Sequence, residues 1–156
     1  MTEQADLINK LGLDSPTQVC LVVRELEQAA QYYENVLGIG PFVFPKIHYK
    51  EITYLGQPSD GYWEMAFARM GPLELELSCP LQTPSIYEDF LNEHGEGLHH
   101  LGFDIDDLDA TIAQAESLGI GVLMSGRTDQ GGFAHLDTRK VGGTIFEAIQ
   151  RPAPRV

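Results

Sequence analysis

The most constraining feature of this chain is an internal repeat, because two copies of one sequence pattern adopt the same local structure. The segments 18–38 and 100–119 each begin with a polar residue followed by a short apolar strand. Each then passes through a charged pair and a Leu, continues as a short helix and runs into Leu-Gly-Ile. A Gly at that point is typical of a helix C-cap. The pattern therefore predicts a strand followed by a helix, twice.

The repeat extends into a later strand of each copy. The segments 73–80 and 145–152 both have a central Glu and a Pro at the end, so that Glu76 and Glu147 occupy equivalent places. We expect two modules on one shared core, since no low-complexity linker separates them. The expected division is an N-terminal extension (1–15), a first module (16–80), a linker helix (81–96), a second module (97–152) and a C-terminal tail (153–156).

Runs of β-branched and aromatic residues between Gly and Pro breaks predict the other strands. The break at Met70-Gly71-Pro72 predicts a hairpin between two of them. The strands expected in the first module are 41–49, 62–69 and 73–79, and those in the second module are 121–124, 133–137 and 144–150.

The charge of the chain limits its partners. The 10 Lys and Arg residues against 23 Asp and Glu residues give a net charge of −13, which disfavours nucleic acids and anionic membranes. No apolar run is long enough to span a membrane, and the polar start of the chain does not resemble a signal peptide. Cys20 and Cys79 lie in strand-like apolar runs, which favours reduced core thiols in a cytoplasmic protein.

Four predicted strands carry a polar residue at repeat-equivalent positions: Gln18, Glu76, His100 and Glu147. If a pseudo-twofold axis relates the modules, these four side chains converge near it. Their oxygen and nitrogen donors suit an octahedral divalent ion with about two positions left for water or substrate. Each residue alone has a simpler explanation, a solvated edge charge or a core histidine. His99 is the rival of His100, and strand alternation places the two on opposite faces.

The chain resembles a known superfamily in three stretches. GEGLHHLGFDIDDLDA at 95–110, ELSCPL at 76–81 and GTIFEAIQ at 143–150 are similar to the second-module opening and the ligand-bearing strands of the vicinal oxygen chelate superfamily. This superfamily includes glyoxalase I, methylmalonyl-CoA epimerase and extradiol dioxygenases, and the match is strongest to the epimerase-like branch. The resemblance covers residues 17–152. It implies an α+β fold in which two tandem βαβββ modules form a curved mixed sheet around a metal-binding cleft.

The resemblance also assigns the four ligand positions of the superfamily to Gln18, Glu76, His100 and Glu147. In the epimerases the first ligand is usually His and the second Gln, whereas Gln and Glu at these places resemble some glyoxalase I enzymes. Extradiol dioxygenases would need a His where this chain has Gln18, so dioxygenase chemistry is not expected. The implied cofactor is a divalent ion, with Co, Ni, Mn, Zn, Fe and Mg all open.

The resemblance further implies where a general base would lie. Epimerases of this superfamily use a Glu on the strand before the second ligand, opposite the fourth ligand, here Glu147. The corresponding residue is Glu64, twelve residues before Glu76. His135 lies twelve residues before Glu147 and is the repeat partner of Glu64, so it is a candidate acid/base or substrate-binding group. The simpler alternatives are an exposed strand charge for Glu64 and a histidine without chemistry for His135.

These observations predict a metal-dependent isomerase or epimerase that abstracts a proton α to a carbonyl through a metal-stabilised enolate. The substrate would be an acyl thioester or a small carbonyl compound, and the scarcity of Lys and Arg argues mildly against coenzyme A. A glyoxalase I-like lyase and a non-catalytic binding protein, similar to bleomycin-resistance proteins, are the alternatives. The protein is expected to be a homodimer.

Overall fold

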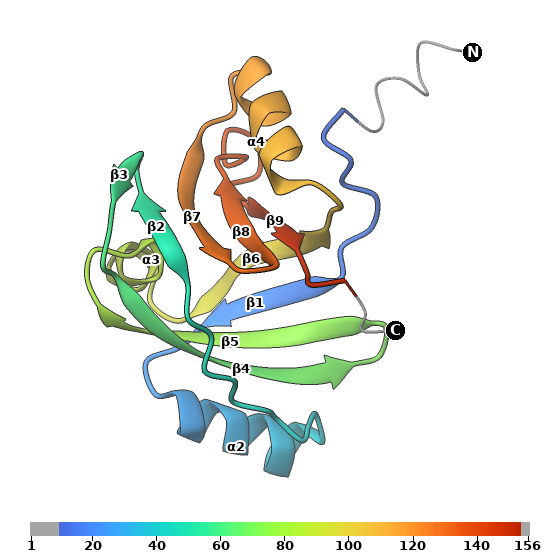
Figure 1. Cartoon of the computed structure of the whole chain (residues 1–156). Helices are drawn as coiled ribbons and strands as arrows, with labels where there is room; N and C mark the ends of the chain where they lie inside the picture. The colour runs from blue at the N-terminus through green and yellow to red at the C-terminus, as the bar shows by residue number, and fades with distance from the viewer. Residues whose placement is uncertain (1–9, 154–156) are drawn as a thin grey trace.

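The computed structural model describes residues 10–153, so most of the expected N-terminal extension and of the tail lies outside the described residues. Within this range one curled sheet contains nine strands in the order β3-β2-β7-β8-β9-β6-β1-β5-β4, as Figure 1 shows. The strands are β1 (Gln18–Val22), β2 (Lys50–Tyr54), β3 (Gln57–Pro58), β4 (Tyr62–Met70), β5 (Leu73–Gln82), β6 (Gly97–Asp104), β7 (Val122–Thr128), β8 (Gly131–Leu136) and β9 (Ile145–Gln150).

The sheet is built from two equivalent halves, which confirms the predicted repeat. β1 pairs parallel with β5, and β5 pairs antiparallel with β4. In the second half β6 pairs parallel with β9, and β9 pairs antiparallel with β8. The halves join at the centre, where β1 and β6 are antiparallel neighbours. The fold is therefore the α+β arrangement of duplicated modules, with the opening strands of both modules side by side.

Three helices of the described residues cover this sheet. α2 (Leu26–Leu37) packs on β4 and β5, and α4 (Leu108–Ser117) packs on β8 and β9 (Figure 1). Gly38 ends α2 in the left-handed conformation, as a C-cap glycine does, and the Asp107 side chain caps α4 by accepting from the Ala110 N–H. α3 (Ile86–His94) forms the linker helix between the modules.

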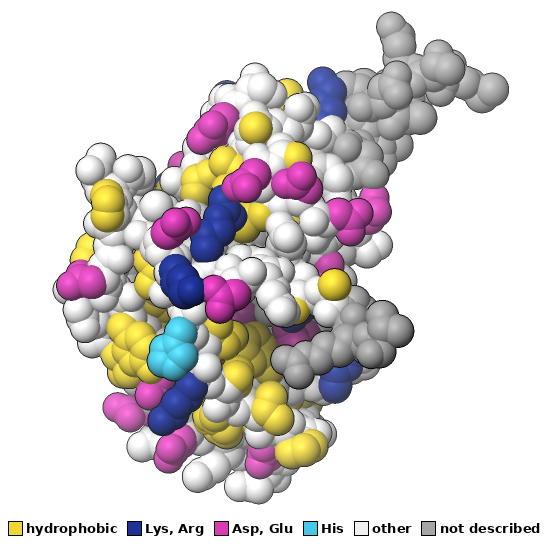
Figure 2. All heavy atoms as spheres, in the orientation of Figure 1, with side chains coloured by type: hydrophobic (Ala, Val, Ile, Leu, Met, Phe, Trp, Pro, Cys, Tyr) yellow, Lys and Arg dark blue, Asp and Glu magenta, His cyan; other side chains and the backbone are white. Residues whose placement is uncertain are grey.

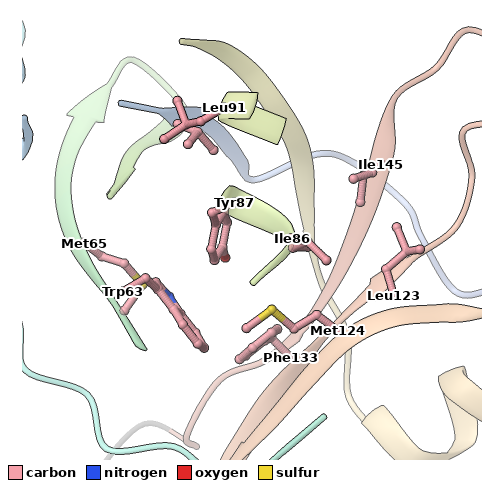
Figure 3. Close-up of a cluster of buried hydrophobic side chains, with 10 residues drawn as sticks. Trp63, Met65, Ile86, Tyr87, Leu91, Leu123, Met124, Phe133 and Ile145 are labelled. Carbon is pink, nitrogen blue, oxygen red and sulfur yellow. The ribbon is translucent and has the colours of Figure 1, made fainter. Parts of the chain in front are cut away.

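A hydrophobic core lies on the concave side of the sheet, separate from the cores under α2 and α4. Trp63, Tyr87, Met124 and Phe133 converge there from both modules and from α3 (Figure 3). The modules therefore share one interior.

The strand expected at 41–49 is wrong. This segment makes only one isolated bridge, between Val43 and Phe67 of β4, and the true strand is β2. Pro41 and Pro45 lack the N–H groups that a continuous ladder needs, which explains the break. β2 instead pairs with β7, so that residues 44–49, which we call the crossing segment, run from one module to the other.

No helix in the described part of the chain is long and apolar enough to cross a membrane.

Candidate metal centre

The four predicted ligands come together at the centre of the concave face. On β1, alternation buries Gln18, Cys20 and Val22 on this face, and the neighbouring strands add Glu76 and His100. The Nε2 atom of His100 lies 2.8 Å from Oε2 of Glu147 and 3.2 Å from Oε1 of Gln18, and Oε2 of Glu76 is 3.9 Å from it. Gln18, Glu76, His100 and Glu147 are all buried, and His100 is completely enclosed.

These spacings suit a divalent ion. Ligand atoms about 2.1 Å from an octahedral ion lie about 3 Å apart at right angles and about 4.2 Å apart across it. Oε2 of Glu147 is buried 2.8 Å from Nε2 of His100 without a hydrogen bond of good geometry, so a cation would compensate its lost hydration. The donors around Nε2 of His100 are therefore compatible with a metal, and Glu76 and His100 belong to a group of described residues whose donor atoms all lie within 4.8 Å of one another.

Gly102 leaves room for the side chain of the proposed ligand Gln18. It lies on β6 directly between Gln18 of β1 and Glu147 of β9. A Cβ atom at this glycine would lie only 2.9 Å from the Gln18 side chain and 2.8 Å from Ile149. The missing side chain therefore lets Gln18 and Ile149 pack closely against the backbone of β6.

The buried charges perturb one another. Burial, assisted by the neighbouring Glu147 charge, raises the pKa of Glu76 to about 7, although His100 opposes this. Burial lowers the pKa of His100, but the two carboxylates outweigh it, and the net direction is upward. Ser78 donates a hydrogen bond of 2.5 Å to Oε1 of Glu76 and so orients that carboxylate.

The expectation that His99 faces away from His100 is wrong. The pairing of β1 with β6 shifts at this point, so that Cys20 opposes His100 and Leu21 opposes Leu98. This β-bulge interrupts the alternation and turns both histidines inward. Nδ1 of His99 lies 2.9 Å from Nδ1 of His100, which allows a hydrogen bond that leaves Nε2 of His100 free for a metal.

His135 extends this arrangement into a cluster of three histidines. Burial, assisted by the His100 charge, lowers the pKa of both His99 and His135 well below the usual range, so both imidazoles are neutral. Ring nitrogens of the three histidines lie within 4.8 Å of one another, which is compatible with metal binding. Nε2 of His135 is also 3.5 Å from Oε1 of Glu147 and 3.4 Å from the Tyr87 hydroxyl. The predicted site therefore has a second layer of imidazoles behind it.

Glu64 does not enter the cleft, contrary to the expectation. On β4 the buried residues Trp63 and Met65 line the cleft, and Glu64 between them is exposed. The two-residue period of the strand therefore turns its carboxylate away from His100. A general base must reach the substrate in the cleft, and the Glu64 side chain does not line it.

The cleft above the four ligands has a volume of about 520 Å³. Gln18, Glu76 and Glu147 line its floor, and the crossing segment lines its rim with residues 46–49. Tyr49 stacks on Trp63 with ring centroids 5.4 Å apart, and Phe133 meets both rings edge-on. Sequence reasoning missed this aromatic wall, although Trp63 in a strand was a signal for it. Figure 2 shows apolar side chains in the lower half of this face, beside a histidine and among both basic and acidic side chains.

Comparison with known proteins identifies the family. Residues 17–136 match the model of the glyoxalase/bleomycin resistance protein/dioxygenase superfamily. The chain belongs to this superfamily. The solved structure of a methylmalonyl-CoA epimerase from Streptomyces coelicolor, in complex with 2-nitronate-propionyl-CoA, has a TM-score of 0.70. It is 20% identical, and the match covers 91% of this chain and 100% of that one, so it supports the superfamily fold.

Curated proteins are similar to this chain over part of their length. The human mitochondrial methylmalonyl-CoA epimerase is 30% identical over 95 residues, which are 60% of this chain and 48% of that protein. The protein slr0090 of Synechocystis is 26% identical over 124 residues, 77% of this chain and 34% of that protein. This chain thus spans about a third to a half of the length of the curated relatives it matches.

Proposed function

We propose that this chain is a divalent-metal-dependent isomerase or epimerase that removes a proton α to a carbonyl. The observation that carries the proposal is the meeting of Gln18, Glu76 and Glu147 around His100 at the floor of a cleft. The similarity to methylmalonyl-CoA epimerases supports the reaction class. An acyl thioester or a small carbonyl compound is the proposed substrate.

The four ligands would hold the ion, and the ion would supply a Lewis acid that polarises the substrate carbonyl. The protein side chains would shape the cleft and move the proton. The aromatic wall covers one side of the cleft and excludes water from the reacting carbon, which strengthens electrostatic interactions there.

Glu147 is the proposed proton acceptor. It lines the cleft, and its Oε1 lies 3.5 Å from Nε2 of His135. His135 does not line the cleft, so its proposed role is to position Glu147. Glu64 is not proposed as the base because its side chain is exposed outside the cleft.

Exchange of the substrate α-proton with deuterium oxide tests the function. The metal-loaded protein is offered acyl thioesters and small α-hydroxy ketones, and exchange is followed by nuclear magnetic resonance. Glu147→Gln should lower exchange about 10²- to 10⁴-fold because the amide cannot accept the proton. Glu64→Gln is the matched control and should exchange normally. Equal rates in Glu147→Gln and the parent protein would remove Glu147 from the mechanism, and no exchange with any substrate would contradict the reaction class.

A glyoxalase I-like lyase is the second candidate, because Gln18 and Glu76 resemble the ligand choice of some of those enzymes. Turnover of thiohemiacetals without exchange of simple ketones or acyl thioesters would favour it. Tight binding of these compounds without turnover would favour the third alternative, a binding protein.

We also propose that the protein is a homodimer. Tyr32 and Val36, one turn apart on α2, expose large apolar surfaces with 53% and 65% of each residue accessible. Light scattering should give twice the mass of 17.3 kDa for the single chain. A mass equal to that of one chain at working concentration would contradict the dimer.

A further inference from the structure

Cys20 occupies the place between two of the proposed metal ligands. In the sheet, Cys20 of β1 is the direct partner of His100 on β6 and of Glu76 on β5. Cys20 is completely buried, and the β1 alternation turns it to the concave face together with Gln18. The structure thus places a thiol, an imidazole and a carboxylate in one row across three strands.

The donor atoms of this row are close enough to bind one ion. Sγ of Cys20, a carboxylate oxygen of Glu76 and a ring nitrogen of His100 all lie within 4.8 Å of one another. Donors about 2.1–2.3 Å from a shared ion lie at most about 4.6 Å apart, so small side-chain adjustments suffice.

An independent feature also points to a cation at this row. Oε2 of Glu147 is buried 2.8 Å from Nε2 of His100 without a hydrogen bond of good geometry. A buried carboxylate oxygen without a well-placed donor is costly, and a cation bound by His100 would satisfy it. The imidazole of His100 therefore lies beside both the thiol and this carboxylate.

We infer that Cys20 is a thiolate ligand of the metal, in addition to the oxygen and nitrogen donors. This inference rests on the proposed metal site and sharpens it. The thiol proton passes to solvent as the sulfur–metal bond forms. Thiolate sulfur favours zinc, cobalt or ferrous iron, and it disfavours magnesium and manganese, which prefer oxygen. The site is therefore selective for the softer ions.

The second cysteine of the chain offers a matched control. Cys79 belongs to the core under α2, and its Sγ lies 3.3 Å from the backbone carbonyl of Arg24. It is absent from the donor groups found in the described part of the chain. Both cysteines are unpaired and buried, so a Ser at either position tests sulfur ligation with similar demands on folding.

Cobalt titration of the metal-free protein tests the inference. Thiolate bound to cobalt absorbs strongly in the near ultraviolet, so the parent protein and Cys79→Ser should show this band. Cys20→Ser should bind cobalt without the band, and its zinc affinity should fall about 10-fold or more while magnesium affinity is unchanged. Cys20→Ala, with circular dichroism to verify folding, replaces Cys20→Ser if the serine variant does not fold.

Two results would overturn the inference in different ways. Stoichiometric cobalt in the parent protein without the band, or a band that persists in Cys20→Ser, would exclude the thiolate and leave the oxygen and nitrogen site intact. Absence of cobalt from the parent protein would contradict both the thiolate and the proposed metal site.

Discussion

At the residue scale, single side chains and one missing side chain determine the shape of the centre. The strand pairing brings the proposed ligands to one place, but the position of the Gln18 side chain depends on Gly102. Its backbone is not in the left-handed region, so the glycine is required by the close approach of Gln18 and Ile149 and not by backbone strain.

Gly102→Ala should therefore weaken metal binding. The added Cβ must displace the Gln18 side chain, and overpacking of this kind costs about 1–3 kcal/mol of stability. Calorimetric titration measures the first effect, and denaturant unfolding of the metal-free protein measures the second. Gly97→Ala on the same strand is the control, because its Cβ would have nothing closer than Phe90 at 4.0 Å. Equal metal affinity in the two variants would show that the packing of Gln18 against Gly102 does not affect metal binding.

Sequence patterns predicted which side chains converge at the centre better than they predicted the surroundings of those side chains. The repeat alone selects Gln18, Glu76, His100 and Glu147, because duplicated strands place equivalent residues near the same axis. The inward turn of His99 could not be predicted, since a bulge depends on the pairing of β1 with β6. The orientation of Glu64 could have been predicted, because its apolar neighbours Trp63 and Met65 belong on the buried face and strand alternation places Glu64 on the other face.

At the element scale, the crossing segment differs most from the prediction. The composition of residues 41–49 predicts a strand, but the strand is β2, which follows this segment directly and pairs with β7. β7 also continues to Thr128, beyond the predicted end at Met124, although Gly126 is a poor strand former. Its pairing with β2 and β8 supplies the ladder that local preference does not. Pairing between distant strands thus explains both the position of β2 and the length of β7.

Tyr49 fixes the crossing segment to the wall of the cleft. Its ring stacks on Trp63, the single tryptophan of the chain, and lies 4.9 Å from Phe133. Tyr49→Ala should lower stability by about 2 kcal/mol and expose Trp63 to water. A red shift of the tryptophan emission reports this exposure. Tyr62→Ala, an exposed neighbour of Trp63 on β4, should leave the emission unchanged. Matching emission spectra in Tyr49→Ala and the parent protein would contradict this role.

At the scale of the whole molecule, the centre lies where the two modules meet. β1 and β6 are neighbours near the middle of the sheet, and the proposed ligands come from these strands and from β5 and β9. A bound ion would therefore link both halves and stabilise only the folded chain.

Zinc or cobalt should raise the unfolding temperature of the metal-free protein. At a free metal concentration 100 times the Kd, the stabilisation would be about 2.7 kcal/mol. His100→Ala removes the shared nitrogen donor and should lose most of the shift in a thermal scan, whereas Glu64→Gln should keep it. An unchanged shift in His100→Ala would place the ion elsewhere.

The pairing of β2 with β7 also bears on how the chain folds and how it could have been assembled. A strand encoded within the first half completes the edge of the second half. Either half made alone would have an unpaired edge, which invites association with another chain. The contact also joins distant parts of the polypeptide and so closes a long loop late in folding. The two modules are thus not equivalent in the folded chain, and each needs the other to complete the strand pairing of the sheet.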